Sequence, residues 1–142
     1  PQLADMLRQQ FGVEVQFGPM GVNSRPALIA DKYAEAQGAD VGAAFHAALN
    51  DAYWLEGRDI EDVQVLKDIA TQVGLDGETL VAALADPRYV AEVDADIEQA
   101  QAYGFSGVPA LVFENQYLVS GYRPPEVLAQ VVEKLQVVSA AE

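Results

Sequence analysis

The chain has 142 residues, 51% of them hydrophobic and 21% charged, and 22 Asp and Glu against 8 Lys and Arg give a formal net charge of −14. This composition can form a buried core and excludes a wholly disordered chain. No apolar run reaches the roughly 18 residues of a membrane span, and so acidic a chain repels nucleic acid. We therefore expect neither a membrane nor a nucleic acid as its partner.

Cysteine is absent, and His46 is the only histidine. A chain without cysteine has no disulfide, no thiolate chemistry and no cysteine-ligated metal. A single histidine leaves no histidine pair for zinc, and the sequence has no G-x-S-x-G turn to supply a nucleophilic serine. We therefore predict no catalytic residue, no metal site and no cofactor within this chain.

The first 22 residues predict a helix followed by an extended segment. Apolar side chains recur at helical spacing from Leu3 to Phe11, and Gly12 can end that helix. Residues 13–17 alternate apolar and polar side chains, as strands do, until Gly18 breaks the pattern. Because the chain starts at Pro1, without Met or a leader segment, we expect it to be part of a longer protein.

From residue 23 to residue 104 the sequence predicts a succession of helices joined by short loops. Apolar residues recur at helical spacing in five stretches, and a glycine follows most of them. The clearest of these helices is expected over about residues 41–56. Short polar side chains that can cap a helix stand before four of the stretches: Asn23 or Ser24, Asp59, Asp76 and Asp86.

After Gly104 the apolar period changes from helical to alternating. Residues 110–113 and 117–120 predict two short strands joined by a turn, and Pro124 and Pro125 begin a last helix. A lone two-stranded hairpin is marginal in water and exposes two edges. We therefore expect self-association through the hairpin edge, or pairing of the hairpin with further sequence of the same protein.

The C-terminal part resembles the DsbA family. The segment Gly-Phe-Ser-Gly-Val-Pro-Ala-Leu-Val-Phe at 104–113 is followed by Val-Ser-Gly at 119–121 and Pro-Pro-Glu-Val-Leu at 124–128. It is most similar to the FrnE-like branch, a neighbour of the 2-hydroxychromene-2-carboxylate isomerases and kappa-class glutathione transferases. Upstream, five short stretches resemble the helical insertion of that family: residues 23–28, 33–34, 56–60, 65–66 and 74–76.

The resemblance implies an α/β, thioredoxin-like fold that is interrupted by an inserted all-α domain. In that family the N-terminal βαβ part carries a Cys-x-x-Cys helix, which has no counterpart in this cysteine-free chain. Residues 1–104 then correspond to the helical insertion, and residues 105–142 to the C-terminal half with its hairpin and last helix. Residues 1–22 fit either the tail of the missing half or the insertion. We favour the insertion for residues 13–17, because Asn23 follows too closely for another helix.

The resemblance also implies a substrate site at Gly107, Val108 and Pro109. In thioredoxin-like proteins this proline follows a cis bond and faces the active-site cysteines. The residue before it pairs through its main chain with an extended substrate. The implied function is cytoplasmic thiol–disulfide exchange on an extended thiol or disulfide peptide. The redox-active cysteines would lie outside this chain, which alone is expected to be inactive.

Two other functions stay open. A glutathione-dependent isomerase or transferase on the same fold would carry a serine or a lone cysteine upstream and would bind glutathione. A cysteine-free helical binding or assembly module would do no chemistry at all. Sequence upstream of Pro1 would distinguish the three functions.

The remaining conspicuous side chains are expected to have structural roles. His46 is expected at or near a helix surface with a local hydrogen-bond partner, and Tyr53 and Trp54 in the helical core. Arg25 and Arg123 are expected to be solvated, with contact to an acidic thiol such as glutathione as the alternative.

Overall fold

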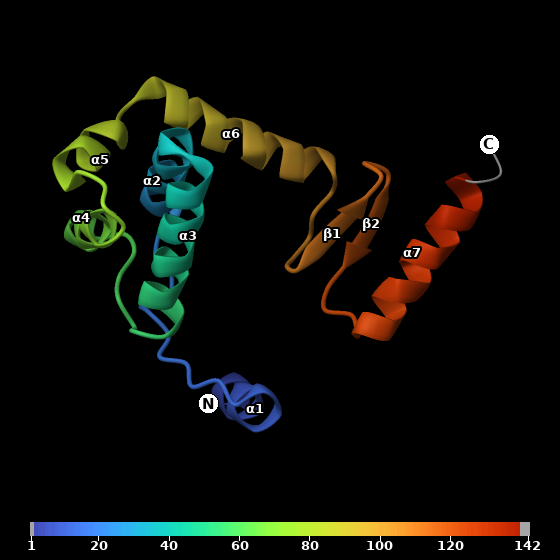
Figure 1. The fold of residues 1–142 in the computed structure, drawn as a ribbon. Helices are drawn as coiled ribbons and strands as arrows, with labels where there is room; N and C mark the ends of the chain where they lie inside the picture. Colours follow the sequence, from blue (N-terminus) through green and yellow to red (C-terminus); the bar gives the residue numbers. More distant parts are fainter. Residues whose placement is uncertain (1, 140–142) are drawn as a thin grey trace. The chain divides into compact units, whose positions relative to one another are not determined.

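The computed structural model describes residues 2–139, and over this range the chain is mostly helical with one β-hairpin, as the sequence predicts. The elements in chain order (Figure 1) are α1 Gln2–Phe11, α2 Arg25–Gln37, α3 Ala39–Trp54, α4 Val63–Gln72, α5 Gly77–Ala83, α6 Pro87–Ala102, β1 Ala110–Phe113, β2 Tyr117–Ser120 and α7 Pro125–Ser139. None of these helices is long and apolar enough to cross a lipid bilayer, in the range that the structure describes.

The chain forms two compact units that divide within α6, between Asp96 and Ile97. The change of apolar period in the sequence comes later, at Gly104, just beyond the end of the same helix. The first unit contains five helices and the first half of α6, and the second contains the rest of α6, the hairpin and α7.

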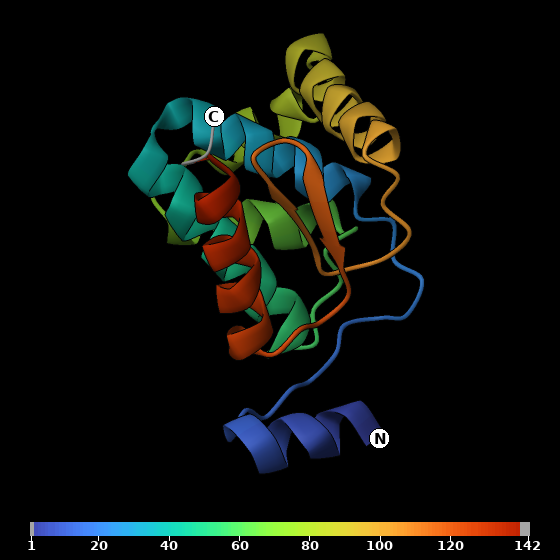
Figure 2. The same ribbon diagram turned by 90° about the vertical axis from the view of Figure 1, so that its right-hand side faces the viewer.

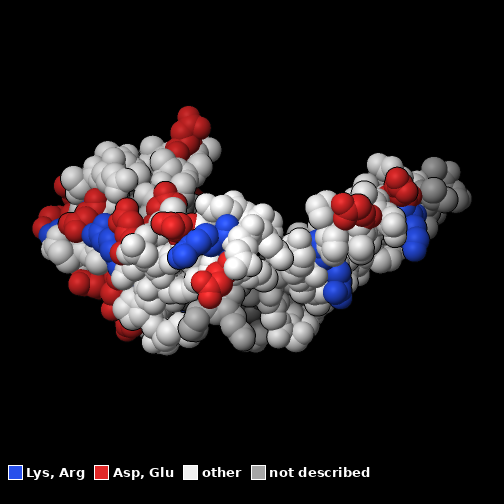
Figure 3. Space-filling model, turned by 90° about the horizontal axis from the view of Figure 1, so that it is seen from below, with Lys and Arg blue, Asp and Glu red and all other residues white. Residues whose placement is uncertain are grey.

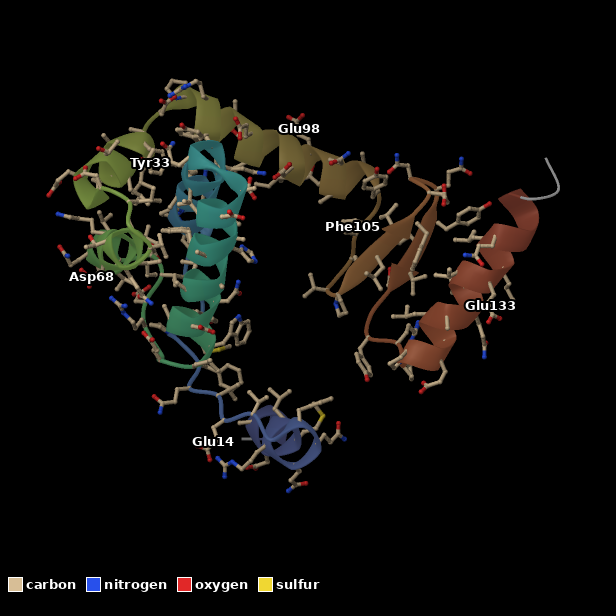
Figure 4. The ribbon with its side chains drawn as sticks, viewed as in Figure 1. Glu14, Tyr33, Asp68, Glu98, Phe105 and Glu133 are labelled. Carbon is tan, nitrogen blue, oxygen red and sulfur yellow. The ribbon has the colours of Figure 1, made fainter. Side chains whose placement is uncertain are left out.

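The first unit has a continuous hydrophobic core. Helix α2 packs along α3, α4 packs against both of them, and α5 packs against α2 and α4. The largest fully buried side chains of this core come from α3, α4 and α5: Phe45, Leu66, Ile69 and Leu80. Tyr33 of α2, labelled in Figure 4, meets Tyr89 of α6 edge to face with 5.8 Å between ring centroids. Apolar burial by five helices therefore holds this unit together.

The caps that begin the helices correct one prediction. Asp62, not Asp59, caps α4, since its carboxylate accepts the N–H of Gln64. The Asp59 carboxylate instead accepts the N–H of Glu61, 2.9 Å away, within the preceding turn. The chain adopts helical geometry only at Val63, so the cap falls one turn later than the sequence pattern suggests.

The other predicted caps are confirmed. Asp76 Oδ1 accepts both the backbone N–H of Thr79, at 2.7 Å, and its hydroxyl, at 2.6 Å. Asp86 accepts the N–H of Arg88 at 2.9 Å before α6. At α2 it is the side chain of Asn23 that accepts a backbone hydrogen bond, from the N–H of Arg25 at 3.0 Å.

Residues 13–17 are extended but belong to no strand. The N–H of Gln16 donates to the carbonyl of Trp54 at 2.9 Å, and the N–H of Gly18 donates to that of Tyr53 at 2.8 Å. Alternate residues thus pair with the last carbonyls of α3, which a helix leaves free. Because a helix end offers only a few such acceptors, these bonds cannot extend into a continuous β-ladder.

The second unit has both predicted strands at the predicted residues. Strands β1 and β2 are antiparallel, with Ala110 opposite Ser120 and Phe113 opposite Tyr117. The turn between them places Glu114 and Asn115 at φ 53°, as the tight turns of hairpins require. Helix α7 lies beside the hairpin in both ribbon views (Figures 1 and 2). None of the side chains described from Ile97 to Gln136 is buried, so this unit has no closed core within that range.

We expect Asp76→Ala to lower the melting temperature near neutral pH. Hydrogen bonds from the hydroxyl and then the backbone N–H of Thr79 hold the pKa of Asp76 below its usual value. A lowered folded-state pKa stabilises the fold above the unfolded pKa of about 3.9, and this stabilisation is lost as pH falls through the folded pKa. The difference in melting temperature between wild type and variant should therefore shrink in acid, as measured by circular dichroism.

Glu98→Ala is the matched control. Glu98 is exposed and makes no ion pair or side-chain hydrogen bond among the residues described, so its removal should leave the melting temperature almost unchanged. Equal melting temperatures for wild type and Asp76→Ala at neutral pH would contradict the role of Asp76 as a cap.

Candidate functional site

The loop that connects α6 to β1 carries the predicted substrate site. It begins at Gly104, and Phe105 stacks on Tyr103 with 5.6 Å between ring centroids (Figure 4). Beyond Phe105 the loop is exposed, and the side chain of Val108 is 93% accessible to solvent. The Val108–Pro109 peptide bond is cis, as predicted. Gly107, Val108 and Pro109 therefore form one exposed stretch directly before a strand.

Some main-chain groups of this loop make no hydrogen bond within the described part of the chain. The carbonyl of Pro109 accepts the N–H of Gly121 at 2.8 Å, which continues the hairpin pairing by one bond. Within residues 2–139, Gly107 and Val108 make no backbone hydrogen bond, and β1 pairs only with β2. Unpaired N–H and C=O groups beside a free strand edge are what an extended peptide needs for strand addition.

The two arginines considered as contacts for an acidic thiol differ in their surroundings. Arg123 is exposed and follows Gly121 by two residues. The guanidinium of Arg25 lies 2.6 Å from the carboxylate of Asp94, in an ion pair between α2 and α6. A second ion pair joins the same two helices, since Lys32 lies 2.8 Å from Asp96, and this hydrogen bond raises the pKa of Lys32. Arg25 thus has a structural partner rather than being simply solvated.

His46 lies on the surface of α3, and its partner comes from the neighbouring helix. Its Nδ1 is 2.7 Å from Oδ2 of Asp31 in α2. The imidazole is 65% exposed, but the Asp31 side chain is only 14% exposed. The second oxygen of Asp31, Oδ1, is buried without any hydrogen-bond partner in the described part of the chain. The surface position of His46 is confirmed, but its partner comes from another helix, 15 residues away in the sequence, and is not local as expected. A buried carboxylate oxygen of Asp31 is left unsatisfied beside it.

The aromatic pair at the end of α3 is less buried than predicted. Trp54 is 45% exposed, and Tyr53 is partly buried. The edge of Trp54 meets Phe17 at 5.6 Å and Tyr53 at 4.9 Å between ring centroids. Because Trp54 is the last residue of its helix, the extended segment 16–18 covers only part of its ring. The prediction of a core position is therefore wrong for Trp54.

Asp31, His46, Tyr53 and Trp54 line one cavity of about 380 Å³ in the first unit. Its walls come from neighbouring faces of α2 and α3. Sequence reasoning missed the cavity and its residues Asp31 and Asn50. The signal was present as spacing, since His46, Asn50 and Tyr53 stand at i, i+4 and i+7 on α3 and so share a face.

Most basic side chains of the described residues pair with a carboxylate, whereas acidic side chains outnumber them. Figure 3 shows basic residues in blue beside acidic residues in red at several places on an otherwise largely uncharged face. No three His, Asp or Glu side chains of the described residues come close enough together to hold a metal ion.

Comparison with known proteins gives three findings. The family model for DSBA-like thioredoxin domains matches residues 3–133. The chain is 29% identical over 115 residues to the ClpXP adapter protein SpxH of Shouchella clausii, a match that covers 77% of this chain and 38% of that protein. It also matches a crystal structure from Nitrosomonas europaea assigned as a protein disulfide isomerase, with TM-score 0.73 and 22% identity, over 93% of this chain and 70% of that one.

Proposed function

Because the chain belongs to the family of DSBA-like thioredoxin domains, we propose that it is part of a thiol–disulfide oxidoreductase of the DsbA or FrnE-like kind. It would supply the helical insertion and the C-terminal half of the thioredoxin-like fold. The redox-active cysteines would come from sequence outside this chain, which has none. The observation that carries the proposal is the exposed loop at Gly107 and Val108, whose main-chain groups are unpaired beside a free strand edge.

The work of this loop would be to hold the substrate. An extended peptide pairs with the N–H and C=O groups of Val108 and so continues the sheet beyond β1. A thiolate at a helix N-terminus in the other half attacks one sulfur of the substrate disulfide, and the second sulfur leaves as a thiolate. A second cysteine then attacks the mixed disulfide, which releases the reduced substrate and leaves the enzyme disulfide. The residues of this chain align the substrate and exchange no electrons themselves.

A binding role without redox chemistry is the second candidate. It is favoured by the match to a protein named as a ClpXP adapter and by the absence of cysteine here. In this function the chain would recognise another protein and react with nothing. A Cys-x-x-Cys element upstream would favour the oxidoreductase, whereas a serine or lone cysteine there would favour the glutathione-dependent isomerase or transferase.

We expect the 142-residue chain to show no insulin reduction and no refolding of a scrambled disulfide substrate. Exchange needs a thiolate, and this chain has none. A longer form with the upstream βαβ unit, roughly thirty residues or more, should be active in both assays. If the longer form has neither cysteine nor serine at the corresponding helix start, the enzyme function fails and the binding role replaces it.

We expect Val108→Pro, made in the longer form, to slow exchange with an extended peptide about tenfold, because it removes one hydrogen-bond donor to the substrate. Val108→Ala keeps that donor and should have little effect. Exchange with a small disulfide that cannot pair with a strand should be unchanged in both variants, and thermal unfolding would check that they fold. Equal slowing by both variants would show that the side chain, not the main chain, holds the substrate.

The hairpin itself should drive self-association of the short form. The strands of the second unit expose Leu111, Tyr117 and Leu118, and no described side chain of that unit is buried. Two strands rarely suffice for a stable sheet, so we propose that two copies pair along a hairpin edge. Light scattering should give a dimer for the 142-residue chain and a monomer for the longer form. A stable monomer of the short form would rule this pairing out.

A further inference from the structure

The cavity between α2 and α3 has the size and the lining of a small-molecule site. Its volume is about 380 Å³, within the range of roughly 300 to 1,000 Å³ that ligand pockets occupy. Leu28, Leu49 and Ile60 line much of it. Apolar walls of this kind suit the apolar body of a ligand.

One polar end of the cavity is formed by Asp31 and His46. Asp31 is mostly buried, and only its Oδ2 has a partner, Nδ1 of His46 at 2.7 Å. A buried polar atom without a partner is costly, and a carboxylate oxygen more so than a neutral one. Because the terminal torsion of an aspartate is soft, either oxygen can meet a donor that enters the cavity.

Two other polar groups of the cavity donate to main-chain carbonyls of the protein. One of the two amide N–H bonds of Asn50 donates to the carbonyl of His46 at 2.9 Å. The hydroxyl of Tyr53 donates to the carbonyl of Pro19 at 3.4 Å. When Nδ1 of a neutral His46 donates to Asp31, its Nε2 is one more acceptor. The hydroxyl of Ser24 and the indole N–H of Trp54 are donors at the cavity wall, and Asp31 is the one carboxylate among the described lining residues. A ligand with a charged donor would therefore pair with Asp31.

The charges around the cavity favour a cation. No Lys or Arg is among its described lining residues, and the chain as a whole carries a formal charge of −14. The rings of Tyr53 and Trp54 border the cavity, and aromatic faces attract ammonium groups. A mostly buried carboxylate, aromatic rings and a negative net charge all favour a positively charged ligand.

We propose that this cavity binds a small primary amine in its ammonium form, with an aromatic or aliphatic body. The ammonium donates to the carboxylate of Asp31, and the body lies against the walls formed by Leu28 and Leu49. This site uses no cysteine and is separate in the sequence from the loop at Val108, so the proposal does not depend on the redox function.

The test uses 2-phenylethylamine as the probe and the fluorescence of Trp54, the only tryptophan, as the signal. Isothermal titration calorimetry provides a second readout. The ammonium probe should bind saturably with a Kd of about 1 mM or tighter, as its size allows. The neutral 2-phenylethanol should bind at least about fivefold more weakly, since it cannot form a charge-assisted hydrogen bond. The anion 3-phenylpropionate should not bind.

Two variants assign the binding to Asp31. Asp31→Asn should abolish the preference for amine over alcohol. The control Asp68→Asn removes an equal charge elsewhere, from a residue of α4 that pairs with Arg58, and should preserve the preference. Leu28→Lys places a tethered ammonium three residues before Asp31 on the same helix. It should abolish binding while the fold, followed by circular dichroism, is kept.

Three results would overturn the proposal. The first is that the amine shows no saturable binding at concentrations up to about 10 mM, well above the Kd expected for this site. The second is equal affinity for the amine and the alcohol. The third is an equal loss of binding in Asp31→Asn and Asp68→Asn, which would indicate attraction by overall charge rather than by this carboxylate.

Discussion

The close approach of α2 and α3 is the constraint on which the first unit depends. A Cβ at Gly42 would lie 2.8 Å from Cα of Glu35, so only glycine lets the two backbones come so near. Small residues on α2, Ala30 and Ala34, are fully buried at the same contact. Because the helices are so close, Phe45 fills the space beneath them, and the side chains of Asp31 and His46 meet at hydrogen-bond distance. The packing of Phe45 and the Asp31–His46 pair therefore both result from the close crossing of α2 and α3.

The two units are stabilised differently. The first buries residues from five helices in one core, whereas no described side chain of the second is buried. A hairpin with a helix beside it leaves apolar surface on the strands without a partner. This difference agrees with the partial coverage of the matched proteins. The chain covers 70% of the Nitrosomonas europaea chain and 38% of the Shouchella clausii protein. The unit that would bind substrate in the proposed exchange reaction is also the unit without a closed core among its described side chains, from Ile97 to Gln136.

Most of the acidity of the chain has a structural role. Asp62, Asp76 and Asp86 cap helices, and Asp94 and Asp96 pair with basic residues of α2. These carboxylates are exposed or have partners, so water or a neighbouring donor satisfies them. Asp31 differs, because its side chain is only 14% exposed and its buried oxygen Oδ1 has no partner in the described part of the chain. It is this exception, and not the net charge alone, that marks the cavity as a site.

The sequence by itself determined the local structure. Periodicity and turn residues predicted the helices, both strands at their observed residues, the caps Asp76 and Asp86 and the loop before β1, because each depends on neighbours within a few positions. What the tertiary structure alone decided depends on distant segments. The pairing of His46 with Asp31, the ion pair of Arg25 and the partial exposure of Trp54 follow from how α2, α3, α6 and the segment 16–18 cross. Spacing shows which side chains share a helix face, but only the packing of helices decides which faces meet and which polar atom is left buried without a partner.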